Sequence, residues 1–217
     1  MQQGKVNYKK LMDKEIQRLR QSGRKPSLLL HACCAPCSSA VLELLSQDFD
    51  ITVFFYNPNI DPESEFVFRL EELQRLLPEM GLESVGVVAP PYDAGEFEKI
   101  AVGLEALPEG GERCKCCYRL RLEKTICYAK EQGFDYVTTT LSVSPYKNAA
   151  WLNIIGQELG EKHGVSYLVS DFKKGEGYKR SCQLSKEYEL YRQDYCGCRY
   201  SKAAMEAKNS KSLMKKM

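Results

Sequence analysis

Short apolar runs alternate with longer amphipathic segments along most of the chain. The runs are rich in β-branched and aromatic residues and have the length of buried strands, at 27–32, 51–57, 83–89, 136–142 and 166–172. Around them, apolar residues recur three and four positions apart, as on a helix face, over 8–22, 38–45, 63–77, 117–131 and 148–162, and after the N-cap candidate Asp93. This alternation predicts an α/β fold, in which helices cover both faces of a parallel sheet.

We expect a single domain. The chain has 217 residues, 43% of them hydrophobic, which suffices for one sizeable core, and neither an internal repeat nor a low-complexity linker marks a boundary. The sequence therefore predicts an N-terminal helix within 1–26 that packs on the domain, one α/β domain over 27–207, and a disordered lysine-rich tail over 208–217.

The composition favours a reducing compartment. No run of about 18 apolar residues is available to span a membrane, and the charged N-terminal segment lacks the apolar core of a secretion signal. We therefore predict a cytoplasmic protein without membrane contact, in which ten cysteines indicate metal binding or redox catalysis rather than structural disulfides. The net charge of +2 shows no strong affinity for polyanions, and the lysine-rich tail is either a solvated end or a nucleic-acid contact.

The first candidate site follows the first predicted strand, where the segment HACCAPC contains Cys33, Cys34 and Cys37. In parallel α/β sheets, ligands bind outside the carboxyl ends of the strands. Asn57 follows the second strand, and the loop 142–147 follows the fourth, so we expect these segments at the same edge. The chain has neither GxGxxG nor GxxxxGK[ST], and therefore no nucleotide phosphate site is indicated.

The second candidate site is RCKCC, just before the helix predicted at 117–131. Cys114 and Cys117 form a CxxC pair, and together with the pair after the first strand they supply four thiolates. That number fits a [4Fe–4S] cluster or a structural zinc. Adjacent cysteines favour the cluster, because a cubane offers each thiolate its own iron. Cys116 is an alternative to either neighbour, so the register of the ligands stays open.

Basic residues accompany the second cysteine motif. They either offset the negative charge of a metal site or form a solvated helix face, and they are Arg113, Lys115, Arg119 and Arg121. Cys127 and Cys182 stand alone in their segments and are interpreted as small core residues.

The third candidate site is YCGC, with Cys196 and Cys198 on either side of a glycine. A disulfide between them closes a very small ring, and departure from ideal disulfide geometry makes such a bond easy to reduce. Two more metal ligands, or incidental core thiols, are the alternatives.

These motifs together resemble one family, the cobalamin-independent QueH-type epoxyqueuosine reductases of tRNA queuosine biosynthesis. The resemblance runs from Leu28 to Ser201. It is carried by LLLHACCAPC, FFYNPNI, PYD, RCKCCYRLRLEKT, GFDYVTTTLSVSPYKN, YLVSDFKK, YKRS and LYRQDYCGCRYS. Few families combine a double cysteine after the first strand with RCxxC and YCGC.

The resemblance implies a Rossmann-like fold and a metal centre. Positions matching Cys33, Cys34, Cys114 and Cys117 would bind a [4Fe–4S] cluster, with one additional iron nearby. Cys37 would lie beside that iron as a possible ligand. Cys196 and Cys198 would be the redox-active pair.

The resemblance also implies an activity, the reductive deoxygenation of epoxyqueuosine to queuosine, which is the final step of queuosine biosynthesis. The reaction needs two electrons, two protons and an electron donor that the sequence does not identify. The substrate base lies in a tRNA anticodon loop, where unpaired bases stack on aromatic or Arg side chains. The candidates for such contacts are Tyr178, Arg180, Tyr188 and Tyr195.

Two other functions stay in consideration. Some related α/β enzymes activate tRNA with ATP for thiolation, but they carry a glycine-rich pyrophosphate loop after the first strand, whereas this chain has HACCAPCSS there. An iron–sulfur carrier or sensor would explain the cysteines. It would not need the polar loops YNPNI and SVSPYKN around one cleft.

Overall fold

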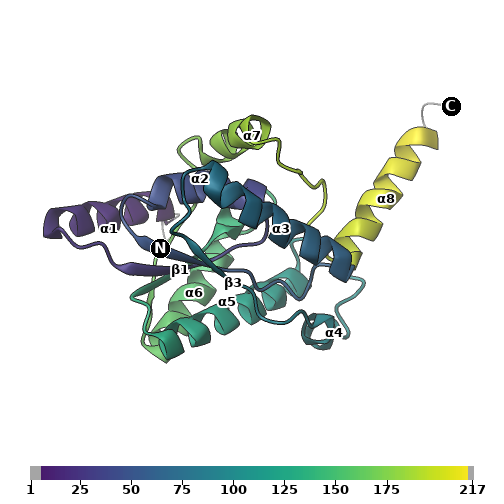
Figure 1. Ribbon diagram of the computed structural model, residues 1–217. Helices are drawn as coiled ribbons and strands as arrows, with labels where there is room; N and C mark the ends of the chain where they lie inside the picture. The colour runs from purple at the N-terminus through teal and green to yellow at the C-terminus, as the bar shows by residue number, and fades with distance from the viewer. Residues whose placement is uncertain (1–5, 215–217) are drawn as a thin grey trace.

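A five-stranded parallel sheet forms the centre of the molecule in the computed structural model, which describes residues 6–214 (Figure 1). The strand order is β3-β2-β1-β4-β5, and all four neighbouring pairs are parallel. The strands are β1 (Ser27–His31), β2 (Asp50–Phe54), β3 (Gly86–Val88), β4 (Tyr136–Thr139) and β5 (Ser166–Tyr167). The predicted α/β class and its Rossmann-like parallel sheet are confirmed.

Helices cover both faces of the sheet. On one face lie α1 (Tyr8–Ser22), α2 (Ala35–Leu45), α3 (Glu63–Glu79) and α7 (Gly177–Glu187), and on the other lie α5 (Glu112–Gln132) and α6 (Ala149–His163). The remaining elements are α4 (Ala94–Ala101), the 3-10 helix η1 (Thr140–Val143) and α8 (Arg199–Met214), which extends away from the body in Figure 1.

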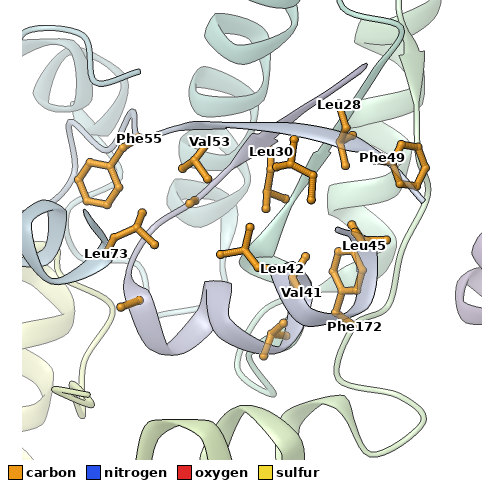
Figure 2. Packing of buried hydrophobic residues seen from close by; sticks show 14 of the residues in the cluster. Leu28, Leu30, Val41, Leu42, Leu45, Phe49, Val53, Phe55, Leu73 and Phe172 are labelled. Carbon is orange, nitrogen blue, oxygen red and sulfur yellow. The ribbon is translucent and has the colours of Figure 1, made fainter. Parts of the chain in front are cut away.

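Alternate residues of the central strand β1 supply both cores. Leu28 and Leu30 pack into the cluster under α1, α2 and α3, whereas Leu29 packs toward α5 and α6. Figure 2 shows the first cluster, where Leu42 of α2 lies between the sheet and the helix layer. Because β1 is buried on both faces, its sequence is an unbroken apolar run, as parallel central strands require.

The helix boundaries follow capping chemistry. Asn7 accepts a hydrogen bond from the Lys10 amide at the start of α1, and Asp93 caps α4 as predicted by accepting one from the Gly95 amide. Two helices begin earlier than predicted: α2 at Ala35, directly after its N-cap Cys34, and α5 at Glu112, after its N-cap Gly111. The second cysteine motif therefore lies within the start of α5 rather than before it.

Two regions differ from the sequence-based prediction. β5 ends at Tyr167 instead of continuing to 172, because the Asn153 side chain of α6 binds the backbone N–H and C=O of Ser170, both at 2.8 Å, in place of a strand neighbour. Helices α7 and α8 were not predicted. α7 packs against α2, where the Ser181 hydroxyl donates to the Pro36 carbonyl at 3.0 Å.

The chain termini bear on the predicted organisation. The apolar face of α1 buries Met12, Ile16 and Leu19 in the core, and residues 1–5 of the predicted N-terminal segment lie outside the described residues. The tail over 208–217, for which we expect disorder, is helical as far as Met214, where it continues the Ala- and Lys-containing helix α8, and 215–217 lie outside the described residues. None of the described helices is long and apolar enough to cross a membrane.

Candidate functional site

Three thiols meet where β1 gives way to α2. Cys34 has an extended backbone and caps the helix, and Cys37 lies in its first turn, so the chain turns sharply around them. The sulfur atoms of Cys33, Cys34 and Cys37 all lie within 4.8 Å of one another, and those of Cys33 and Cys34 are 3.7 Å apart. Three soft thiolate donors in such proximity can hold a metal ion or part of an iron–sulfur centre.

A second group of thiols lines one small cavity. Cys114 and Cys117 face it from the start of α5, and Cys196 and Cys198 face it from the loop before α8. The structure therefore brings together two motifs that are far apart in the sequence. Cys116 is not among the residues that line this cavity. Cys33 packs against the same hydrophobic cluster as Cys114, so these two thiols share one side of the sheet.

Two buried guanidinium groups lie among the thiols. Arg121 is 1% exposed, and its Nε donates to the Cys117 carbonyl at 3.3 Å. Burial alone lowers the pKa of Arg121, but the thiols of Cys117, Cys196 and Cys33 outweigh it and raise that pKa. Arg69 is 2% exposed and pairs with Glu65, and its pKa is also raised, because the Cys34 and Glu65 charges outweigh burial.

The buried cations test whether an anionic metal centre fits here. Nη2 of Arg121 is buried without a hydrogen-bond partner in the part of the chain that the structure describes. A buried charge with an unused donor is costly unless a negative group lies nearby. Since several thiolates around a metal carry net negative charge, the donor set and its cations fit a metal or iron–sulfur centre.

The thiols themselves differ in acidity. Hydrogen bonds from Cys34 and Cys37 lower the pKa of Cys33 well below its usual value against the effect of burial, while the pKa values of Cys34 and Cys37 are raised. Burial raises the pKa of Cys117 to about 11. Among Cys33, Cys34 and Cys37, the thiol of Cys33 is therefore the first to lose its proton.

His31 ends β1 directly beside the thiols, but its ring is committed to the fold. Nε2 lies 3.1 Å from the Tyr56 carbonyl, which can only accept, so Nε2 carries the proton and Nδ1 accepts from the Thr139 hydroxyl at 2.8 Å. Burial, with the nearby Arg121 charge, lowers the pKa of His31 to about 3. Both ring nitrogens are occupied, and His31 is a neutral structural residue.

The loop that contains Cys196 and Cys198 depends on its glycine. Gly197 has a φ of +109°, which L side chains rarely adopt, and a Cβ there would lie 3.1 Å from Nη1 of Arg69 and from Cγ1 of Ile60. The Gly197 carbonyl accepts from the Asp61 amide at 3.0 Å. The thiol pair is thus held against the loop that follows β2.

Comparison with known proteins identifies the family. A sequence model described as "Epoxyqueuosine reductase QueH" matches residues 28–204. The chain belongs to the QueH family. The resemblance seen in the sequence is thereby confirmed, and the matched range contains all three cysteine motifs.

Three QueH-family relatives, each named "Epoxyqueuosine reductase QueH", align over most of their length. The protein of Streptococcus pyogenes is 41% identical over 91% of this chain and 78% of its own. That of Staphylococcus epidermidis is 40% identical over 91% and 85%, and that of Staphylococcus aureus is 37% identical over 95% and 87%. Among solved structures, a predicted subunit of a tRNA methyltransferase from Methanocaldococcus jannaschii matches 74% of each chain at 16% identity, with a TM-score of 0.49.

The structure corrects the interpretation of several residues in this QueH-family chain. Of the four basic residues near the second motif, Arg113 and Arg121 are buried and line the thiol cavity. Arg113 donates to three loop carbonyls. At the surface, Arg119 pairs with Glu158 and Lys115 with Glu112. Cys127 and Cys182, expected in the core, are half-buried.

Sequence reasoning missed two residues of the QueH-family site. Lys147 and Arg69 are buried at the thiols. The sequence placed the loop 142–147 at this edge but gave Lys147 no role, and it gave no reason to place Arg69 there. Lys147 belongs to the polar loop SVSPYKN, so its position at a strand end was the available signal. Arg69 looked like a solvent-facing residue of α3, and only the packing of the Cys196 loop reveals its role.

Proposed function

We propose that this chain is an epoxyqueuosine reductase that acts on tRNA. The reaction removes the epoxide oxygen of epoxyqueuosine with two electrons and two protons and yields queuosine and water. The observation that carries the proposal is family membership over residues 28–204. Each of the three cysteine motifs within that range contributes to the buried thiol groups described above.

We assign a [4Fe–4S] cluster to Cys33, Cys34, Cys114 and Cys117, and one additional iron to the vicinity of Cys37. Four thiolates match the ligand number of such a cluster. The shared packing of Cys33 and Cys114, and the buried Arg121 charge near Cys33 and Cys117, support this ligand set. When bound, the cluster would pass electrons singly and the iron would polarise the epoxide C–O bond.

The protein's own residues supply the remaining requirements. Cys196 and Cys198 can store two electrons as a dithiol and release them on forming a disulfide, which matches the two-electron demand of the reaction. Arg121 and Arg69 balance the negative charge of the thiols in the buried site. The surrounding apolar residues Phe97 and Tyr118 limit access of water to the same cavity.

The tRNA contact is part of the proposal, and the candidates for base stacking differ in their surroundings. Tyr195 lies under the Arg69 guanidinium, 5.5 Å from ring centroid to Cζ, and directly precedes the thiol pair. Nearby, Phe68 and Tyr191 form an exposed edge-to-face pair. Arg180 is engaged with Glu43, and Tyr188 packs against the core. We therefore place the anticodon loop on the Tyr195 side, with an electron donor of unidentified nature.

The start of α2 disfavours ATP-dependent thiolation. In nucleotide-binding α/β folds, the phosphates sit against free amides at the N-terminus of this helix. Here Pro36, which has no N–H, occupies the first turn and removes one of those amides. The carrier alternative is not favoured either, because the relatives are named as reductases.

A direct assay tests the proposal. Protein purified without oxygen is incubated with an anticodon stem-loop carrying epoxyqueuosine and a chemical reductant, and the nucleosides are separated by mass spectrometry. We expect conversion to queuosine without ATP or cobalamin, and binding that weakens as salt is added, since phosphate contacts release counterions. Absence of conversion by a preparation that holds its full iron content would refute the reductase activity. Conversion that requires ATP would favour the thiolating class.

A further inference from the structure

A buried ammonium group lies between the Cys196–Cys198 pair and a carboxylate. Lys147 precedes α6, and its side chain is only 7% exposed. Its Nζ donates to Cys196 Sγ at 2.9 Å and to Glu109 Oε1 at 3.1 Å. Burying a lysine charge costs several kcal/mol unless negative partners compensate it. Both partners are therefore needed to explain why the chain buries Lys147 here.

The two sulfurs of the pair receive unequal hydrogen bonds. Cys196 Sγ receives the ammonium of Lys147, whereas Cys198 Sγ receives the Ser201 amide at 3.4 Å. The hydrogen bond from the Cys198 thiol and the Lys147 and Arg121 charges lower the pKa of Cys196, although burial opposes them. The pKa of Cys198 is raised by its hydrogen bond to Cys196 and by burial. Because the Lys147 ammonium contacts Cys196 Sγ, whereas Cys198 Sγ receives a neutral amide, the negative charge of the reduced pair resides on Cys196.

A closed set of hydrogen bonds fixes this arrangement. Glu109 accepts from Lys147 with one oxygen and from the Ser201 hydroxyl, at 2.9 Å, with the other. The Ser201 hydroxyl in turn accepts from the Cys196 amide at 3.0 Å. The Lys147 backbone is held as well, because its N–H donates to the Ser144 carbonyl at 3.2 Å, next to the cap of α6. The ammonium cannot leave the sulfur without disturbing several contacts.

We propose that Lys147 is a positioning residue of the Cys196–Cys198 pair, whose ammonium places the negative charge of the reduced pair on Cys196 and favours the dithiol over the disulfide. The inference rests on the proposed function only in taking the pair to be redox-active. Reduction of the disulfide consumes two electrons and one proton: the S–S bond breaks, Cys196 becomes a thiolate, and Cys198 takes the proton. The neutral disulfide gains nothing from the ammonium, so Lys147 stabilises one side of the couple.

Glutathione equilibria measure this effect. The full-length protein, prepared with its metal centre and without oxygen, is equilibrated with reduced and oxidised glutathione, quenched in acid, unfolded and alkylated. Trypsin cuts after Arg192 and Arg199, so a single peptide, 193–199, contains Cys196 and Cys198 and no other cysteine. Its mass states report the oxidised fraction of the pair, independently of the other eight cysteines and of any tRNA substrate.

Lys147→Met removes the charge while keeping the length of the side chain. We expect the equilibrium constant for reduction by glutathione to fall about tenfold, which lowers the midpoint potential by about 30 mV for a two-electron couple. Lys147→Arg keeps a cation at the sulfur and should restore most of the difference. Lys162→Met is the control, because the Lys162 ammonium pairs with Glu123 at 3.1 Å, and it should leave the equilibrium unchanged.

We expect Glu109→Gln to shift the equilibrium constant for reduction by glutathione in the direction opposite to Lys147→Met. Replacing the carboxylate with an isosteric amide removes a negative charge that competes for the ammonium, so reduction of the pair should become more favourable. A general loosening of the fold would move Lys147→Met and Glu109→Gln in the same direction. That result, or an unchanged equilibrium in Lys147→Met, would overturn the proposal. If Lys147→Met does not fold, the sign of the Glu109→Gln shift decides.

The outcome is separable from that of the proposed function. A shifted glutathione equilibrium in Lys147→Met, together with a wild-type protein that does not convert epoxyqueuosine, would retain the role of Lys147 and remove the reductase activity. An unchanged equilibrium in Lys147→Met, together with normal conversion by the wild-type protein, would retain the reductase activity and remove the role of Lys147.

Discussion

The two edges of the sheet differ in whether their charged side chains are exposed or buried. At the amino ends of the strands, charges pair at the surface: Lys25 with Asp50 at 3.2 Å and Arg24 with Asp135 at 3.6 Å, with every partner's side chain at least 45% exposed. At the carboxyl ends, the cations Arg69, Arg121 and Lys147 are buried beside thiols. Exposed pairs of the first kind contribute little to stability, whereas buried cations are costly and persist where a function requires them.

The free-energy cost of burying these three cations indicates which edge of the sheet carries the function. Buried ion pairs such as Lys147–Glu109 and Arg69–Glu65 could be replaced, both partners together, by apolar residues of similar size, often with a gain in stability. Their presence therefore indicates that the thiols beside them carry negative charge during the working cycle. The following predictions test how strongly each edge depends on its charges and on its backbone geometry.

The largest effect is expected at the proposed ligands. Cys114→Ala should remove the cluster, since each cubane iron needs its thiolate, and the same holds for Cys33, Cys34 and Cys117. Protein prepared without oxygen should be brown and contain roughly five irons in the wild type. Iron analysis and the optical spectrum measure the loss. Cys116→Ala is the matched control on the same helix. Retention of the cluster in Cys114→Ala with its loss in Cys116→Ala would shift the ligand register by two residues.

The redox pair is expected to matter for turnover but not for the cluster. Changing both Cys196 and Cys198 to Ser should leave the iron content near normal and reduce turnover by more than about 100-fold, the scale on which removal of a reacting group is felt. Iron content and queuosine formation are measured on one preparation. Loss of iron would make these thiols ligands, and unchanged turnover would make them bystanders.

Gly197→Ala tests the geometry that presents the pair. We expect the free energy of unfolding to fall by about 1–3 kcal/mol, because the left-handed backbone is strained for alanine and its Cβ contacts Arg69 and Ile60 at 3.1 Å. Turnover should fall with it as the sulfurs move. Gly103→Ala is the control, since Gly103 has a φ of +77° but no atom within 4 Å of the added Cβ. Urea unfolding and turnover of both variants are compared, and equal turnover in the two would rule out the contact effect.

The smallest effect is expected at the amino edge. A hydrogen bond from Arg18 lowers the pKa of Glu15 from 4.5, against partial burial. A lowered carboxyl pKa stabilises the fold above pH 4.5, and the stabilisation disappears as the pH falls through the folded-state value. Glu15→Gln should thus lower the free energy of unfolding by less than about 1 kcal/mol at pH 7. The difference should shrink in urea titrations below pH 4.5, and a difference that grows there would contradict the assignment.

Most of the architecture could be predicted from the sequence, because local pattern determines it. Local pattern shows directly which residues are buried, both in the apolar runs of β1 and β2 and in the spaced apolar residues of α1 and α3. The short β5 could not be predicted, since Asn153 of another element takes over the backbone of Ser170. α7 was missed because its few apolar residues are buried by packing on α2, which only the fold supplies.

In the candidate site, too, some features follow from the local sequence and others require the complete fold. The proximity of Cys33, Cys34 and Cys37 follows from neighbouring positions around one helix start, and the sequence shows it. The meeting of Cys114 and Cys196 in one cavity requires the complete fold. The roles of Lys147 and Arg69 depend on contacts between distant segments, so no local pattern distinguishes them from surface residues. The ligand assignment and the redox role of the pair stay predictions until they are measured.

The position of the thiol pair in the sequence also determines when the site can assemble during protein synthesis. Of the three cysteine motifs, Cys33 and Cys34 emerge from the ribosome first, the α5 thiols follow, and Cys196 and Cys198 emerge last. Domains fold largely as units once their sequence is available. The thiols of the first two motifs are therefore synthesised before the loop that packs beside them. The centre closes last, when the loop after α7 lays Gly197 against Ile60 and Arg69.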